Sequence, residues 1–187
     1  MLSAALFLDR DGVINIDHGY VCKREHFQFI DGVFELVRFA IKRKFLIIII
    51  TNQSGIGRGY YSEGEFLKLT KWMCHEFIIN EAPITQVYYS PYHPAAAKSK
   101  YRKEHPSRKP NPGMILDVKA DFGIDLNRSV LIGDKASDIA AGNAAGIGVN
   151  LLFDSKKDPQ LNGLNYLHIA NLHQANAYLN SGAEFGS

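Results

Sequence analysis

Cysteine and long apolar runs are both scarce in this sequence. The chain contains only two cysteines, Cys22 and Cys74, and they form no Cys-x-x-Cys pair, so we expect neither a disulfide framework nor a thiolate metal site. The longest apolar run, Phe45–Ile50, is far shorter than the roughly 20 residues that a membrane helix needs. The N-terminus shows no basic segment followed by a cleavable apolar stretch. These absences predict no membrane association and favour a reducing cytoplasm.

An excess of either charge is also lacking. The 21 basic and 19 acidic residues give a formal net charge of +2. The sequence shows neither a strongly basic face nor a basic stripe interleaved with aromatic residues, so we expect no nucleic-acid partner. Basic side chains crowd residues 98–109, where Glu104 is the only acid. For Lys98–Lys103 a solvated loop is as good an interpretation as a functional one.

The length and composition are those of one globular domain. A chain of 187 residues that is 46% hydrophobic is able to bury a substantial core. We expect this domain to span residues 1–181 and to be a monomer. The ending 182–187 has no helical period and resembles a disordered tail or a cloning scar.

Short apolar runs alternate with segments of helical period along the chain. Ser62 and Glu65 form a capping box, and the apolar side chains that recur from Phe66 to Phe77 predict the core face of a helix. The alternation predicts an α/β fold that resembles a Rossmann-like doubly wound, mostly parallel sheet with helices on both faces. The expected strands are Ala4–Leu8, Phe45–Ile50, Gln86–Tyr89, Ser129–Ile132 and Gly148–Leu152.

Two carboxylates lie one residue apart after the first of these runs. Asp9 and Asp11 precede Gly12, and ligands of open parallel sheets bind beyond the carboxyl ends of the strands. On extended backbone the two acids point the same way and Arg10 points elsewhere. Because the two charges repel, we expect a hard divalent cation with oxygen ligands between them. An acidic turn that only caps a strand has the same residues, so the motif needs partners.

Partners follow at the ends of later runs. Thr51–Ser54 supplies hydroxyls and amides, and Asp134–Asp138 supplies further acids. Between them Lys109 precedes a helix that we expect to begin at Pro112 with Asn111 as its N-cap. An Asp-x-Asp, a Thr, a Lys and an acidic pair in this order resemble the four motifs of the haloacid dehalogenase-like phosphatase superfamily.

Within that superfamily the resemblance narrows to one family. The segments Asp9–Asn15, Thr51–Gly59, Arg108–Met114 and Gly133–Ile139 are similar to those of the D-glycero-D-manno-heptose 1,7-bisphosphate 7-phosphatases, whose close relatives are the histidinol-phosphate phosphatases. The resemblance implies a magnesium-dependent phosphatase that acts on a small phosphorylated sugar through an aspartyl-phosphate.

The resemblance also implies residue roles. Asp9 is the expected nucleophile, Asp11 the acid and base, and Thr51 and Lys109 the groups that hold the phosphoryl oxygens. Mg²⁺ is expected on Asp9, the Asp11 backbone carbonyl and Asp134, while Asp138 orients Lys109 or a metal-bound water. The expected substrate-binding residues are Arg10, Asp17, His18, Gly19, Tyr20, Asn52, Gln53, Ser54, Arg108 and Lys135.

Two of these expectations concern selectivity. Cap domains of the superfamily enter after the first motif or between the second and third, but Ile14–Ile30 and Ser90–Ser107 are short, so we expect an essentially capless site. Arg108 lies beside the reaction centre, where a guanidinium grips a second phosphate bidentately.

The chain departs from the resembling families at one place. They carry a zinc loop with the pattern Cys-x-His and then Cys-x-Cys, and the four matching positions here hold Ser90, Tyr92, His105 and Ser107. Structural zinc needs thiolates or several imidazoles. We therefore expect no zinc, and we interpret His93 and His105 as ordinary loop histidines.

Three other functions remain open. Histidinol phosphate or another small phosphomonoester is a possible substrate, since the motifs report chemistry more than substrate. A polynucleotide 3′-phosphatase has a similar second motif, but the charge distribution argues against it. A phospho-accepting signalling receiver also combines acids, a Thr and a Lys on a doubly wound sheet, but it places its acceptor aspartate on a central strand after the acidic pair.

Overall fold

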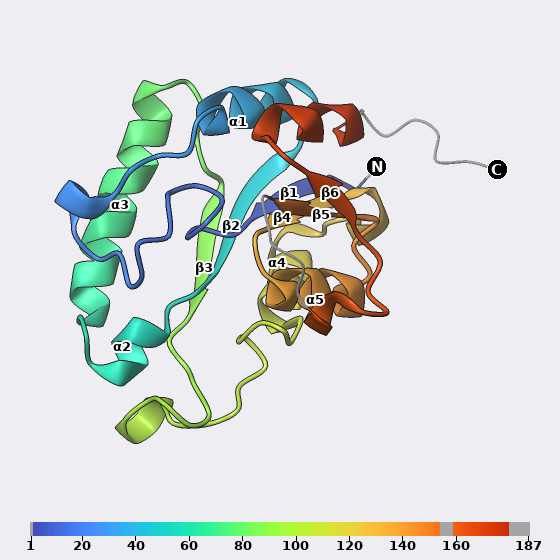
Figure 1. Cartoon of the computed structure of the whole chain (residues 1–187). Helices are drawn as coiled ribbons and strands as arrows, with labels where there is room; N and C mark the ends of the chain where they lie inside the picture. The colour runs from blue at the N-terminus through green and yellow to red at the C-terminus, as the bar shows by residue number, and fades with distance from the viewer. Residues whose placement is uncertain (1, 154–158, 180–187) are drawn as a thin grey trace.

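A sheet of six parallel strands forms the centre of the computed structural model, which describes residues 2–153 and 159–179 (Figure 1). The strand order is β3-β2-β1-β4-β5-β6, and every neighbouring pair is parallel. The strands are β1 (Ala5–Leu8), β2 (Leu46–Asn52), β3 (Gln86–Ser90), β4 (Val130–Gly133), β5 (Val149–Phe153) and β6 (Leu167–Ile169). The parallel sheet is confirmed, while the expected tail at 182–187 lies outside the described residues.

Helices cover both faces of the sheet, as expected. One face packs against α1 (Val33–Lys42), α3 (Glu63–Ile79) and the C-terminal 3₁₀ segment η5 (Leu172–Tyr178), and the other against α4 (Gly113–Phe122) and α5 (Ala136–Ala145) (Figure 1). The two cores follow from the alternation of side chains along each strand. In β1, Leu6 and Leu8 enter the first core, while Ala5 and Phe7 enter the second.

Local signals in the sequence fixed some helix ends better than others. The Ser62–Glu65 capping box is present at the start of α3, and the side chains of its apolar stripe are buried. The expected N-cap at Asn111 is wrong, because α4 begins at Gly113 with Pro112 in the cap position. The Asn111 side chain instead donates to His105 O at 3.2 Å. The short strand β6 at the sheet edge was not expected.

The order of the strands creates a crevice between β1 and β4. The chain passes from β1 outwards to β2 and β3, and then returns to β4 on the other side of β1. The connections leaving β1 and β4 therefore diverge at their carboxyl ends, which is where open α/β sheets bind ligands. Asp9 and Asp134 are the first residues after these two strands.

The connections around the crevice are short. The segment from β1 to α1 contains only the 3₁₀ segment η1 (Arg24–His26), and the segment from β3 to α4 only η2 (Ser99–Tyr101). A five-residue helix, α2 (Ser54–Arg58), follows β2 directly. The described residues thus contain no inserted cap, and none of their helices is long and apolar enough to cross a membrane.

Candidate active site

Asp9 lines a cavity of about 340 Å³ at the end of β1. Its backbone N–H donates to Ile132 O of β4 at 3.1 Å, which ties the two strands together at this point. The carboxylate is largely buried, and its contacts fall on Oδ1: the Arg10 N–H at 2.7 Å and Lys109 Nζ at 3.0 Å. Within the described residues no group donates to Oδ2, so this oxygen is available to a ligand.

The Lys109 ammonium is buried beside Asp9. Its Nζ, on a residue only 2% exposed, lies 2.8 Å from Ile50 O, 3.0 Å from Asp9 Oδ1 and 2.5 Å from Asp138 Oδ1. Burial lowers the pKa of Lys109, but the carboxylates of Asp138 and Asp9 outweigh this effect and raise it. The ammonium therefore stays charged, and Asp138 holds it in place next to Asp9.

The end of β2 supplies hydroxyl and amide groups, which were expected to line the pocket. Asn52 clasps the backbone of Lys109, donating from Nδ2 to Lys109 O at 3.0 Å and accepting from Lys109 N at 3.1 Å. Gln53 donates to Thr51 Oγ1 at 2.9 Å and accepts from the Tyr61 hydroxyl at 2.6 Å. Because Thr51 Oγ1 accepts this bond, its own proton is free for an oxygen of a ligand.

Arg10 does not point away from Asp11, which corrects one expectation. It is 1% exposed, and Nη2 lies 2.8 Å from both Asp11 oxygens and donates to Val21 O at 2.8 Å. The strand ends at Leu8, and the chain then turns through Gly12 at φ +94°, so the alternation of an extended strand does not apply here. Arg10 therefore holds the Asp11 carboxylate in place and does not itself line the cavity.

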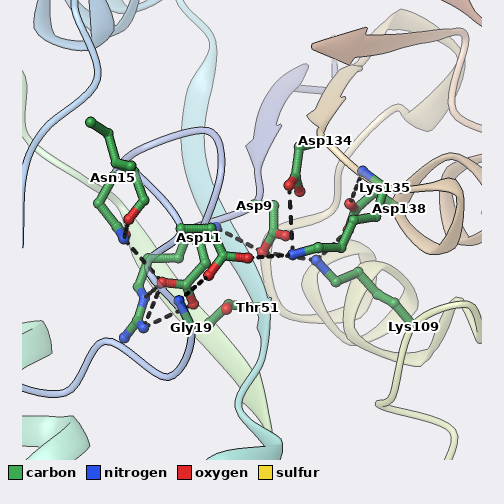
Figure 2. Close-up of polar contacts among 12 residues, drawn as sticks. Asp9, Asp11, Asn15, Gly19, Thr51, Lys109, Asp134, Lys135 and Asp138 are labelled. Atoms are coloured by element: carbon green, nitrogen blue, oxygen red, sulfur yellow. Dashed lines mark hydrogen bonds and ion pairs between the residues drawn. The ribbon is translucent and has the colours of Figure 1, made fainter. Parts of the chain in front are cut away.

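Two further donors fix the Asp11 carboxylate. Asn15 Nδ2 donates to Oδ1 at 3.0 Å, and Gln53 Nε2 donates to Oδ2 at 3.0 Å. Figure 2 shows Asp11 held on the Asn15 side while Asp9 faces Lys109 and Asp134. The two acids of the motif therefore have different surroundings, as distinct chemical roles require.

Three carboxylates converge beside Asp9. Oxygen atoms of Asp9, Asp134 and Asp138 all lie within 4.8 Å of one another. Asp134 approaches this closely because residue 12 is glycine, where a Cβ would lie 2.2 Å from Asp134 Oδ2. The two Asp138 oxygens face Lys109 Nζ and the Lys135 N–H, whereas the buried Asp134 Oδ1 has no hydrogen-bond partner among the described residues.

The electrostatics of this cluster fit a divalent cation. Burial raises the pKa of Asp9 to about 7, and the neighbouring acids add to this effect while Lys109 opposes it. Burial likewise raises the pKa of Asp134 to about 6, with Lys135 opposing and Asp138 adding. Raised values mean that the negative charges lack sufficient compensation, and oxygen donors with excess negative charge are what Mg²⁺ binds.

The loop before η1 covers one side of the cavity. Asp17 accepts from Gly19 N at 2.9 Å and pairs with Lys135 Nζ at 3.0 Å, which joins this loop to the start of α5. Gly19 and Tyr20, both at positive φ, line the cavity, and with His18 they also line an adjoining surface hollow. His18 itself does not line the cavity that holds Asp9.

Arg108 also lines the cavity, and the carbonyl of Tyr92, one residue of a four-residue cluster, holds its guanidinium. Its Nη1 donates to Tyr92 O at 3.0 Å. The Tyr92 ring stacks on His105 with centroids 3.8 Å apart and planes 10° apart. Ser107 Oγ lies 2.7 Å from His105 Nδ1 and 3.0 Å from Ser90 Oγ. We call Ser90, Tyr92, His105 and Ser107 the loop clip.

Most of the expected site residues therefore share one cavity. All of them line it except Arg10, His18 and Asp134, which lie as described above. Tyr61 and Ser137 also line it and were not expected. Ser137 lies within the fourth motif, where its position was a signal, but nothing in the sequence links Tyr61 to Gln53.

The chain is similar in sequence to known proteins. A HAD-hydrolase-like family model matches residues 106–163. The chain is 54% identical over 152 residues to the D-glycero-alpha-D-manno-heptose-1,7-bisphosphate 7-phosphatase of Burkholderia mallei, covering 81% of this chain and 80% of the relative. It is 45% identical over 157 residues to the D-glycero-beta-D-manno-heptose-1,7-bisphosphate 7-phosphatase of Vibrio cholerae, covering 84% of each.

Solved structures share the fold. A HAD-like phosphatase from Mesorhizobium loti superposes with a TM-score of 0.88 at 28% identity, covering 99% of this chain and 90% of that one. A D,D-heptose 1,7-bisphosphate phosphatase from B. bronchiseptica, complexed with magnesium and phosphate, superposes with a TM-score of 0.81 at 22% identity, covering 94% and 97%.

The carboxylate cluster predicts opposite effects of Asp134→Asn with and without metal. The wild type loses stability as the pH rises through the raised pKa of Asp134, because its folded state must then hold a poorly compensated negative charge. Asp134→Asn lacks this charge, so at mildly alkaline pH we expect the free energy of unfolding of the metal-free protein to rise by about 1–2 kcal/mol. Magnesium chloride should raise the melting temperature of the wild type but hardly that of the variant. Asp117→Asn, an exposed change on α4, is the control, and an equal magnesium shift in Asp134→Asn contradicts the assignment.

The loop clip predicts a protein without structural zinc. Its one imidazole already contacts Ser107, and two hydroxymethyl groups and a phenol do not replace thiolates. Elemental analysis of protein purified without added metal should find no stoichiometric zinc, and incubation with a chelator should leave the melting temperature unchanged. One tightly held zinc ion per chain would show that the clip is a metal site.

Proposed function

The chain belongs to the haloacid dehalogenase-like phosphatases, and from this membership we propose that it removes the 7-phosphate of a D-glycero-D-manno-heptose 1,7-bisphosphate. Relatives at 40–54% identity that carry this activity in their names support the substrate. Their names include both anomers, so the proposal covers the two. Histidinol phosphate remains as an alternative substrate for the test below.

One observation carries the proposal: a single cavity combines an acidic end and a basic wall. Asp9, with Thr51 and Lys109, fits the phosphoryl group that is cleaved. Arg108 lies on the same cavity and fits a second phosphate. A volume of about 340 Å³ lies at the lower end of the usual range for ligand sites and suits a substrate of sugar size.

The proposed reaction has two displacements on phosphorus. In the first, Asp9 Oδ2 attacks in line, and the bond from phosphorus to the C7 oxygen breaks as Asp11 gives that oxygen a proton. In the second, Asp11 takes a proton from water, which attacks the aspartyl-phosphate and releases inorganic phosphate and Asp9. Splitting one difficult hydrolysis into two displacements is the advantage of a covalent route.

The surrounding residues hold these groups in position. The Thr51 hydroxyl and the Lys109 ammonium are placed to bind phosphoryl oxygens, which carry the charge in the transition state. Arg10, Asn15 and Gln53 orient the Asp11 carboxylate. Mg²⁺ held by Asp9, the Asp11 backbone carbonyl and Asp134 would offset the repulsion between the nucleophile and the phosphate.

The proposal also covers the domain organisation of the enzyme, its metal, its location and its pathway. It is a single-domain monomer over residues 1–181 that uses Mg²⁺ and no zinc. It works in the cytoplasm on a free sugar phosphate, without nucleic acid or membrane, at a step that leads to a lipopolysaccharide precursor.

Variants of the two motif acids should separate their roles. Asp9→Asn removes the oxygen nucleophile, so we expect turnover to fall by at least about 10³-fold while the protein still folds. Asp11→Asn should slow both steps by about 10²–10⁴-fold and keep its magnesium-dependent melting shift, since its backbone carbonyl remains. Near-wild-type phosphate release from Asp9→Asn contradicts the covalent route.

A substrate screen tests the proposed function itself. Phosphate release is measured with heptose 1,7-bisphosphate of each anomer, heptose 7-phosphate, histidinol phosphate and a 3′-phosphorylated oligonucleotide. We expect the highest kcat/KM for a bisphosphate, and Arg108→Ala should reduce the preference over the 7-phosphate by about 10–150-fold, because a charge-assisted contact is lost. Arg38→Ala, on α1, is the matched control. Equal kcat/KM for bisphosphate and monophosphate in the wild type rules out this substrate assignment.

A further inference from the structure

A second guanidinium, that of Arg58, lies close to Tyr20 and Arg108, two residues of the cavity wall, although Arg58 does not itself line the cavity. Arg58 is the last residue of α2, one helical turn after Ser54 on the cavity wall. Its Cζ lies 5.7 Å from the centroid of the Tyr20 ring, which lines the same cavity. Its Nε is buried and has no hydrogen-bond partner within the described residues. Arg58 lies in the segment Thr51–Gly59, but none of the residue roles assigned above includes it.

Close packing of α2 brings Arg58 towards Arg108. At Gly57 a Cβ would lie 2.4 Å from Pro91 O and 2.9 Å from Ala97 Cβ, so only glycine lets α2 contact the segment after β3. Gly57 O also accepts from Lys98 N at 2.7 Å. Figure 1 shows α2 next to this segment, drawn in yellow-green. The residue after Pro91 is Tyr92, whose carbonyl holds Arg108, so both arginines flank residues 91–92.

Arg58 is close enough to Arg108 to affect the pKa of Arg108. Burial lowers the pKa of Arg108, and the positive charge of Arg58 lowers it further. Burial also lowers the pKa of His93, and both guanidiniums add to this effect. Neither arginine forms an ion pair with an acid in the part of the chain that the structure describes.

Two neighbouring like charges, neither in an ion pair among the described residues, favour the binding of an anion, although the Glu104 carboxylate partly offsets the charge of Arg108. Each guanidinium repels the other, and an anionic group that binds both offsets this repulsion. Arginine is favoured where a phosphate is gripped by two parallel N–H bonds, and its planar fork is not replaced by lysine. The carboxylates, Thr51 and Lys109 already account for the phosphate that is cleaved, which leaves the arginine pair for another.

Tyr20 links this pair to the sugar-binding side of the cavity. Its backbone is at φ +53°, a conformation that a bulky residue seldom adopts. Its ring packs edge-on against Tyr60, with centroids 4.7 Å apart, and faces the Arg58 guanidinium. The strained backbone therefore places an aromatic wall that limits where the Arg58 side chain can lie.

We propose that Arg58 is a specificity-determining residue that binds, together with Arg108, the phosphate that is not cleaved. This inference rests on the proposed function, since it needs a substrate with two phosphates. Arg58 binds this phosphate from α2 and Arg108 binds it from the segment before α4. The relative position of α2 and the segment before α4, which is set by the close packing at Gly57, then selects substrates by the distance between their two phosphates.

Arg58→Gln removes the charge and keeps the length of the side chain. We expect the ratio of kcat/KM for heptose 1,7-bisphosphate to that for heptose 7-phosphate to fall by about 10-fold or more. Arg58→Lys, which keeps the charge but loses the fork, should lose less. Arg128→Gln is the matched control: Arg128 also has a buried Nε without a partner, but it lies in η3 (Leu126–Arg128), before the amino end of β4 and away from the cavity. Its ratio should equal that of the wild type.

Two further measurements separate binding from a structural role. The inhibition constant of heptose 1-phosphate, the product that keeps the distal phosphate, should rise in Arg58→Gln and stay unchanged in Arg128→Gln. If both arginines bind one phosphate, the loss in Arg58→Gln combined with Arg108→Ala should differ from the sum of the single losses. Melting curves establish that each variant is folded. If Arg58→Gln does not fold, the same measurements are made on Arg58→Lys.

The possible outcomes are distinct. A wild-type preference for the bisphosphate that survives in Arg58→Gln overturns the inference and leaves the proposed function intact. An equal loss of kcat/KM for both substrates in Arg58→Gln assigns the residue a structural role and also overturns it. Absence of any preference in the wild type overturns the proposed function, and the inference with it.

Discussion

The buried ammonium of Lys109 joins the separate parts of this site. It contacts the Ile50 carbonyl of β2, the Asp9 carboxylate after β1 and the Asp138 carboxylate of α5. A buried charge is strongly destabilising when it loses its partners, so these elements must keep their relative positions whenever the protein is folded. The Asn52 side chain adds a clasp on the Lys109 backbone. The position of the Asp9 carboxylate is thus set by the same contacts that hold the sheet ends together.

The parts of this arrangement that the sequence predicted share one physical origin. Parallel strands bring their carboxyl ends to one edge, so polar residues after each apolar run had to meet, as Asp9, Thr51 and Asp134 do. The strand alternation and the helix stripe of α3 were equally readable, because burial of one face leaves a period in the sequence. The observed ends of the strands differ from the predicted ends by at most two residues.

The features that the sequence did not predict depend on tertiary contacts, which leave no periodic pattern in the sequence. Arg10 turned onto Asp11 because the chain leaves extended geometry at Gly12, and a strand rule did not describe it. Tyr61 reached Gln53 across α2. The cap of α4 fell on Pro112 because Asn111 was already bonded to the carbonyl of His105. Each case is a competition between a local preference and a tertiary partner that only the folded chain reveals.

The short loops around the cavity have a consequence for how this protein changes over evolutionary time. Without a cap among the described residues, the proposed function leaves recognition of the substrate beyond the reacting phosphate to a few side chains on the loop of Asp17–Tyr20, on α2 and on the segment that carries Arg108. The two hydrophobic cores lie on the faces of the sheet and contain none of these side chains. Single substitutions at the cavity mouth are therefore able to alter substrate choice while fold stability and phosphoryl chemistry persist.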